Sequence, residues 1–300
     1  MHRKHFKVLL IVVLFSLFIS LPAWSQIEDN LKRYTGSNAE GYMKPIVNGL
    51  AANMNRGWYQ SAKIPTMGLR LRVGLVAMIA PIPDDDKTFT ATTEGSFNPA
   101  QEAQASTVVG SEEAVMVTGT GGSVYAFPGG LNMNATAFAV PQVTVGLMGS
   151  EAIVRFFKAD LGDSDLGSLQ VLGLGIRHSI SQYLFMFPID ISAGFFWQDI
   201  SVDEDLLKMN AIHYGVQASK GFGLLTLYGG LGFDSGSAKL KYNFQDVNTN
   251  TQLPVEMDIN GDSGMEITAG LGLNMALLHL TADATFGNRT AFALGLALGL

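Results

Sequence analysis

The sequence predicts an all-β fold: a transmembrane antiparallel β-barrel of about 12 strands (range 10–14), with a short N-terminal helical segment. Three observations predict it. The 300-residue chain opens with a segment typical of exported proteins. Hydrophobic residues make up 47% of it and charged residues only 15%. Finally, the apolar residues alternate with small or polar ones instead of forming long runs, as expected for strands with lipid on one face.

Residues 1–25 have the three parts of a secretory signal peptide. A basic start (MHRKHFK) precedes an apolar run from Val8 to Leu21, and PAWSQ places Ala23 and Ser25 ahead of a cleavage site before Gln26. An N-terminal membrane anchor is the alternative, but the run is short for a membrane-crossing helix, which needs about 20 residues. We therefore expect the mature chain to begin at Gln26.

The composition argues against several classes of function. There is no cysteine, and therefore no disulfide framework, no thiolate nucleophile and no cysteine metal site. The net charge of −7 argues against nucleic acid as a partner. We expect no cofactor, no metal site and no enzymatic activity.

Alternation with a period of two is clearest in residues 290–300, TAFALGLALGL, where large apolar residues alternate with Ala and Gly. Similar segments, each about ten residues long, occur at 67–80, 188–199, 211–219, 224–234, 265–276 and 279–287. A sheet in hydrocarbon can pair all its backbone groups only by closing into a barrel, so the leucines are expected to face lipid and the small residues the lumen. A soluble β-sandwich is the alternative, but its outer faces carry more Lys, Glu and Thr.

Polar, turn-rich stretches separate these segments. We expect loops at 158–168, 234–239 and 248–264. From Pro81 to about Gly122 the sequence predicts a large outer loop, or a loop with a strand inside it. Residues 63–300 form the barrel domain in this interpretation.

Residues 26–62 do not alternate and are predicted to form a helical segment before the barrel. The stretch from Ser37 to Glu40 has the pattern of a capping box. An apolar stripe at helical spacing follows: Tyr42, Met43, Ile46, Val47, Leu50 and Met54. Pro45 fits such a helix only near its start or at a kink. The sequence leaves open whether this segment plugs the lumen or lies in the periplasm.

Three stretches carry a resemblance to a known family: MNRGWYQSAK (54–63), PQVTVGLMGSEAIVRFF (141–157), and LGLGIRHSISQY with PIDISAGFFW (174–183 and 188–197). Their order resembles an uncharacterised Gram-negative outer-membrane family, a domain of unknown function. The resemblance implies a barrel with an N-terminal segment and supplies no catalytic residues. In architecture alone, the chain also resembles the long-chain fatty-acid transporters.

Charged residues on the predicted lumen face are the candidates for a ligand site. They are Arg70, Arg72, Glu151, Arg155, Glu266, His279 and Asp283. One interpretation is a basic strip, Arg70, Arg72 and Arg155, that meets the carboxylate of an amphiphile. The other is a structural ion-pair network across the lumen with Glu151, Glu266, Asp190 or Asp283.

Other motifs do not support catalysis or metal binding. His279, Thr281 and Asp283 share one face, but residues two apart on a strand are too distant for direct side-chain hydrogen bonds. Asp258, Asn260 and Asp262 have calcium-loop spacing, yet the glycine falls one place late and no glutamate occupies the twelfth position. Four aromatic residues are predicted to form part of an interfacial belt: Trp58, Tyr59, Trp197 and Tyr214.

Two functional hypotheses follow for a protein of the Gram-negative outer membrane. One is passive transport of a small hydrophobic or amphiphilic compound, with a pocket where the 42–54 helix meets the lumen near Arg70 and Arg72. The other is a structural, adhesive or assembly role through the extracellular loops, with a lumen filled by side chains. The expected partners are outer-membrane lipid, the outer-membrane assembly machinery and, for transport, a small hydrophobic ligand.

Overall fold

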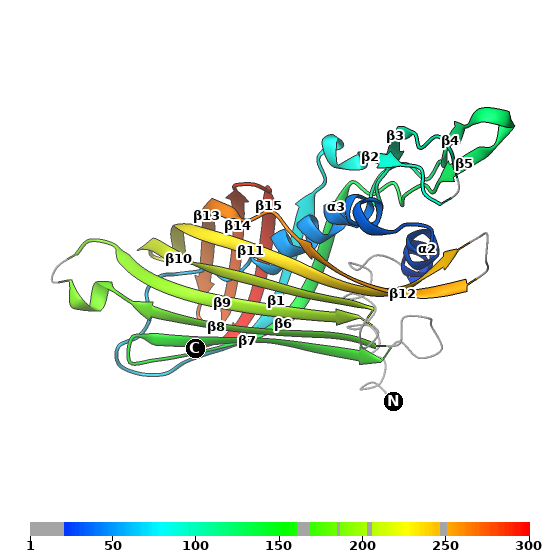
Figure 1. Cartoon of the computed structure of the whole chain (residues 1–300). Helices are drawn as coiled ribbons and strands as arrows, with labels where there is room; N and C mark the ends of the chain where they lie inside the picture. The colour runs from blue at the N-terminus through cyan, green and yellow to red at the C-terminus, as the bar shows by residue number, and fades with distance from the viewer. Residues whose placement is uncertain (1–20, 96, 161–167, 185–186, 203–205, 247–250) are drawn as a thin grey trace.

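The main element of the computed structural model is a closed antiparallel barrel of ten strands (Figure 1). The described residues are 21–95, 97–160, 168–184, 187–202, 206–246 and 251–300. The strands, in order around the barrel, are β1 (Arg70–Pro81), β6 (Ala135–Leu147), β7 (Ser150–Asp160), β8 (Ser168–Ser179), β9 (Asp190–Val202), β10 (Leu207–Phe222), β11 (Leu225–Asp246), β13 (Gly264–Met275), β14 (Leu278–Phe286) and β15 (Ala291–Gly299). Pairing of β15 with β1 closes the ring. The count lies within the predicted range but below the predicted twelve.

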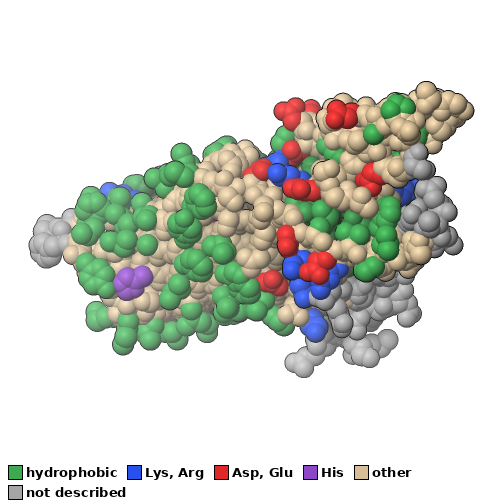
Figure 2. All heavy atoms as spheres, viewed as in Figure 1, with side chains coloured by type: hydrophobic (Ala, Val, Ile, Leu, Met, Phe, Trp, Pro, Cys, Tyr) green, Lys and Arg blue, Asp and Glu red, His purple; other side chains and the backbone are tan. Residues whose placement is uncertain are grey.

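The predicted alternation is confirmed by the exposure of the side chains. Along β15, Phe292, Leu294, Leu296 and Leu298 are exposed, whereas Ala291 and Ala293 are buried. Along β1, Leu71, Val73 and Ile79 are exposed, while Arg70, Arg72, Val76 and Met78 are buried. Figure 2 shows the result on one face: hydrophobic side chains cover the barrel wall, and charged side chains gather mainly near and on the other half of the molecule.

The two ends of the barrel differ in their connections. At one end, here called the turn end, two-residue turns at 148–149, 223–224 and 276–277 join neighbouring strands. Met148 and Gly149 both have positive φ angles, as a tight hairpin turn requires. The short helix η3 (Ser181–Tyr183) and the last residue, Leu300, also lie at this end.

At the other end, here called the cap end, residues 82–134 and the N-terminal helices form a folded cap (Figure 1). The elements of the cap are α2 (Leu21–Leu31), α3 (Gly36–Met54), η1 (Asp84–Lys87), β2 (Thr88–Thr92), β3 (Glu102–Ser106), β4 (Val115–Thr118), η2 (Thr120–Gly122) and β5 (Val124–Phe127). β2 pairs with β3 and β4 with β5. The region from Pro81 to Gly122 was predicted as a large outer loop or as a loop with a strand inside it. It contains strands, so the second prediction is the closer one.

The cap has an apolar core centred on α3. All six predicted stripe residues of this helix are buried, and they belong to one cluster with Phe127, Phe138 and Leu240. The hydroxyl of Tyr42 donates a hydrogen bond to the carbonyl oxygen of Gly129 (3.1 Å). Burial raises the pKa of Tyr42 to about 12, so this phenol stays protonated at neutral pH. None of the helices in the described part of the chain is long and apolar enough to cross a membrane.

The predicted capping box is wrong. Helix α3 begins at Gly36, and its N-cap residue, Thr35, makes no capping bond with its own side chain. The carboxylate of Glu94 in the cap takes over this function: it accepts hydrogen bonds from the Thr35 amide (3.1 Å) and the Asn38 side chain (2.5 Å). Pro45 lies inside α3, away from its start.

Two of the predicted loops are wrong because strands continue past the barrel rim. Residues 234–239 belong to β11, and most of 248–264 forms β12 (Thr251–Asn260), which pairs with the second half of β11. There the cap covers Ala238, Leu240 and Ile259, which are buried. β12 and β13 pair with successive parts of β11. Between them, the three residues 261–263 lie opposite only two residues of β11, 235–236. The extra residue makes a β-bulge. Of the predicted loop 158–168, residues 158–160 end β7, Ser168 begins β8, and the rest lies outside the described residues.

Candidate functional site

The barrel lumen is occupied by residues 55–62, here called the inner segment, which connect α3 at the cap end with the start of β1 at the turn end. Trp58 and Tyr59 are 2% and 5% exposed, and Trp58 stacks on Phe196 with ring centroids 5.1 Å apart. The prediction that these two residues belong to an interfacial belt is therefore wrong. A Cβ at Gly230 would lie 2.3 Å from the Tyr59 ring, so the small lumen face of the strand makes room for this segment.

At the turn end, one buried carboxylate binds two arginines. Glu151 on β7 accepts hydrogen bonds from Arg70 on β1 (Nη1 to Oε2, 2.9 Å) and from Arg177 on β8 (Nε to Oε1, 3.1 Å). Arg70 also donates to the carbonyl oxygen of Lys63 (2.7 Å), and Arg177 to that of Ser61 (3.4 Å). The two arginines thus fix the chain where it leaves the lumen.

Arg72, the next lumen-facing residue on β1, has no carboxylate partner among the described residues. Its Nη1 donates to the side-chain oxygen of Gln60 on the inner segment (3.0 Å), and its Nε is buried without a partner. Gln60 in turn lies 3.5 Å from Glu151 through its Nε2. Gln60 therefore links the unpaired guanidinium to the ion-paired carboxylate.

In the middle of the lumen, Arg155 is fully buried and is held by neutral groups. It donates to the side-chain oxygens of Gln142 (2.9 Å) and Gln198 (3.0 Å) and to the carbonyl oxygen of Arg56 (2.8 Å). Its guanidinium carbon lies 3.5 Å from the centroid of the Trp58 ring, a cation–π contact. This arginine is thus a central anchor of the inner segment.

Nearer the cap end, the inner segment contributes a cation to an acidic pair. Arg56 forms ion pairs with Asp234 on β11 (2.6 Å) and with Glu266 on β13. His213 Nδ1 on β10 lies 2.7 Å from Asp234 Oδ1 and 3.2 Å from Glu266 Oε1. One ligand-type atom from each of His213, Asp234 and Glu266 lies within 4.8 Å of the others, a spacing that could hold a metal ion. The Arg56 guanidinium already supplies the cation that these carboxylates need.

His279 and Asp283, both on β14, have separate partners. His279 contacts Asn274 Oδ1 (2.9 Å) and the carbonyl oxygen of Gly299 (3.3 Å). Asp283 accepts a hydrogen bond from the hydroxyl of Tyr228 (2.9 Å). The two side chains make no hydrogen bond with each other in the described structure, as the spacing along one strand predicts.

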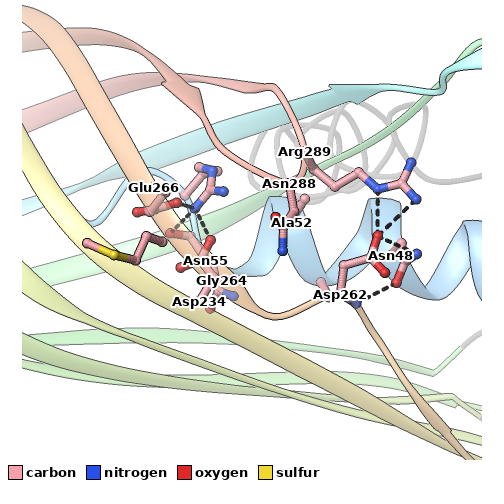
Figure 3. Close-up of a pocket in the computed structure, with 12 residues that line it drawn as sticks. Asn48, Ala52, Asn55, Asp234, Asp262, Gly264, Glu266, Asn288 and Arg289 are labelled. Atoms are coloured by element: carbon pink, nitrogen blue, oxygen red, sulfur yellow. Dashed lines mark hydrogen bonds and ion pairs between the residues drawn. The ribbon is translucent and has the colours of Figure 1, made fainter.

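A polar clamp joins α3 to the barrel rim at the cap end (Figure 3). Asn48 on α3 donates to Asp262 in the β-bulge (2.9 Å) and accepts from the Asp262 amide (2.9 Å). Arg289, in the turn between β14 and β15, binds Asp262 (3.2 Å) and also Asp86 in η1. One arginine therefore connects the bulge, the last hairpin and the cap.

Three cavities lie beside the inner segment in the described part of the chain, and all three are small. The cavity at the clamp has a volume of about 20 Å³, the one around Arg56 and Asp283 about 10 Å³, and the one next to Arg72 about 30 Å³. A water molecule needs about 10–15 Å³ of such space, so each has room for only one or two waters. Among these cavities, none has room for an organic solute.

All seven sequence-predicted site residues lie in the lumen, but they divide into separate groups. Arg70 and Glu151 meet at the turn end, whereas Glu266 lies nearer the cap end, and Arg155 binds neither Glu151 nor Asp283 directly. The sequence analysis missed the lumen residues Arg56, Gln60, Arg177, His213 and Asp234. Alternation alone would have placed Arg177 beside Gly173 and Gly175 on the lumen face. Asp234 lies where the predicted strand 224–234 meets the predicted loop 234–239, and it was not singled out.

A family model described as "Family of unknown function (DUF6588)" matches residues 2–300. The chain belongs to this family. No curated protein matches it.

Several solved structures are similar to the DUF6588 chain at low identity. The N-terminal β-barrel domain of OprF from Pseudomonas aeruginosa is 16% identical, with a TM-score of 0.26, over 51% of this chain and 98% of that one. Ail from Yersinia pestis is 12% identical, with a TM-score of 0.22, over 77% and 94%. The toluene transporter TodX from P. putida is 13% identical, with a TM-score of 0.27, over 89% and 72%. At such TM-scores these similarities carry no information about activity or ligand.

Proposed function

We propose that this DUF6588 protein is an outer-membrane barrel that is closed by its own inner segment and presents the cap outside the cell for a structural or adhesive role. The observation that carries the proposal is the filled lumen. Arginines on β1, β7 and β8 bind the inner segment, and the three described cavities beside it have room for one or two waters each. The exposed apolar face of the strands supports placement in a membrane.

The connections support the orientation. In bacterial outer-membrane barrels the short turns face the periplasm and the longer connections face outward. The two-residue turns of the turn end fit the periplasmic side, and the cap then lies outside. Because the chain has no cysteine, single cysteines can report this orientation without background.

The orientation test uses Ser123→Cys in the cap and Lys220→Cys near the turn end, both exposed positions. Intact cells are treated with a membrane-impermeant maleimide. We expect labelling of the cap cysteine in intact cells and of the turn-end cysteine only after the outer membrane is opened. Labelling in the reverse pattern would overturn the proposed display of the cap.

The closure test is a conductance measurement on the purified full-length protein in planar lipid bilayers. We expect no steady conductance above that of the bare bilayer. A variant that lacks residues 26–62 is expected to conduct, which shows that the assay detects an open barrel. Conductance of the intact protein equal to that of the deletion variant would contradict a closed lumen.

Passage of a small amphiphile is a second candidate, favoured by Arg70, Arg72 and Arg177 at one end of the lumen, which could attract a carboxylate. The sequence analysis expected its pocket where α3 meets the lumen near Arg70 and Arg72, and this is wrong. Helix α3 packs near Ala80, at the other end of β1, about 33 Å from Arg70 along the strand. Passage would therefore need displacement of the inner segment.

A disulfide distinguishes the two candidates. The hydroxyl oxygens of Ser61 and Ser219 are 3.5 Å apart, so Ser61→Cys with Ser219→Cys fastens the inner segment to β10. We would measure entry of a fluorescent fatty acid into proteoliposomes. Entry that stops on oxidation and returns on reduction would favour transport. No entry in either state would support the closed barrel, and the single variants control for the substitutions.

A further inference from the structure

The turn end of the lumen has more buried positive charge than buried negative charge. Among the described residues, Arg70, Arg72 and Arg177 are buried there at 8%, 9% and 1% exposure, and the buried carboxylate beside them is Glu151. Arg70 and Arg177 share this carboxylate. Buried charges are normally paired, because removing a charge from water costs several kcal/mol unless an opposite charge replaces the solvent. Arg72 has no such partner in the described structure.

Arg72 also borders a cavity. Besides Arg72, the polar residues that line it include Gln60 of the inner segment, Gln142 and Thr144 on β6, and His279 and Thr281 on β14. The Nε of Arg72 is buried and makes no hydrogen bond, so one donor of this cation is left unpaired.

The strand seam shapes the same cavity. On β1 and β15, the residues that border it include Gly74, Gly295 and Ala297. A Cβ at Gly295 would lie 2.3 Å from the hydroxyl oxygen of Thr281, so larger residues would close this space. The alternation of leucine with glycine and alanine in β15 thus places apolar bulk outside and leaves room inside.

We propose that this cavity is a binding site for one monovalent anion of the size of chloride, held by Arg72. The hydroxyl of Thr144 is available as a further donor from the cavity wall. The volume of about 30 Å³ accepts an ion slightly larger than water and excludes bulky organic anions. The bound anion supplies the counter-charge that Arg72 lacks and, through Arg72 and Gln60, stabilises the inner segment. The site does not depend on the proposed role of the cap.

The test measures thermal unfolding of the full-length protein in detergent at constant ionic strength, with sodium chloride replaced stepwise by sodium gluconate. A ligand that binds the folded state raises Tm with its concentration. We expect Tm to rise with chloride in the wild type and the midpoint of this dependence to move at least tenfold higher in Arg72→Gln. Lys220→Gln, which removes an exposed cation near the same end, is the control and should behave like the wild type.

Crystals soaked in sodium bromide provide a second measurement that does not depend on the folding of a variant. An anomalous peak within contact distance of the Arg72 guanidinium supports the site. Absence of that peak at a bromide concentration that saturates the Tm effect would overturn the proposal, as would equal chloride dependence in Arg72→Gln and the wild type. Arg72→Lys keeps the charge and should retain a weaker dependence on chloride.

Discussion

Two consecutive parts of the N-terminal region, α3 and the inner segment, are held by opposite kinds of interaction. Helix α3 buries an apolar stripe in the cap core and makes few polar contacts with the barrel beyond Asn48 and Asn53. The inner segment is held by arginines, glutamines and carboxylates, in addition to the packing of Trp58 and Tyr59. The difference shows that the barrel interior adds directional polar contacts to packing, whereas the cap binds α3 mainly by burying apolar surface.

The largest expected effect comes from the charged part. Glu151→Ala leaves Arg70 and Arg177 buried without their carboxylate, which should lower the free energy of unfolding by about 4 kcal/mol. Urea unfolding of the protein in detergent measures this change in the free energy of unfolding. Glu102→Gln, at an exposed position of β3, is the control and should change little. A loss for Glu151→Ala no larger than for the control would mean that the arginines are solvated in the lumen.

Substitutions in the apolar stripe of α3 should destabilise the protein less. Their effect should depend only on how much side-chain volume is removed. Ile46 is 1% exposed in the cap core, and Ile46→Ala should cost about 3 kcal/mol through lost burial and the cavity left behind. The conservative change Ile46→Val should cost about 1 kcal/mol. Similar losses for the two substitutions, measured by the same unfolding experiment, would show that α3 does not pack tightly on the cap.

Close to the junction of the two parts lies Gly57, in the inner segment, which has a φ of +69°. Gly57→Ala combines backbone strain with a Cβ 2.4 Å from a Val76 methyl group, and we expect a loss of about 2 kcal/mol. Gly68→Ala is a matched control, because Gly68 has a φ of +85° but open space around it. Only backbone strain applies there, and the expected loss of stability is about 1 kcal/mol. Equal losses would show that contact with β1 does not constrain the junction.

The smallest effect is expected at the clamp, which joins α3 to the barrel rim. Arg289→Gln removes the ion pairs to Asp86 and Asp262 and should cost about 1 kcal/mol, since these groups are partly exposed. Hydrogen exchange should become faster in α3 and in the β-bulge while the middle of the barrel is unaffected. Lys87→Gln, in a surface pair with Asp84, should leave exchange unchanged.

The sequence predicted what depends on periodicity and missed what depends on long-range packing. Alternation identified the outward leucines of β15 and the inward arginines of β1, because a strand in a barrel has one environment on each face. The extension of β11 was not predictable in this way, since its buried residues Ala238 and Leu240 are covered by a cap formed from distant segments. Trp58 and Tyr59 were misplaced because aromatic residues suit both an interface and a lumen, and only the path of the inner segment decides between them.

The course of the inner segment also constrains the order of assembly. The segment passes from the cap end to the turn end, and the seam that encloses it joins Arg72 with Gly299, from opposite parts of the sequence. Either the seam closes around a segment already in place, or the residues of α2 and α3 traverse the lumen before they fold against the cap. In both orders the finished protein is mechanically interlocked: the segment leaves the lumen only if α3 detaches from the cap or the β1–β15 seam opens.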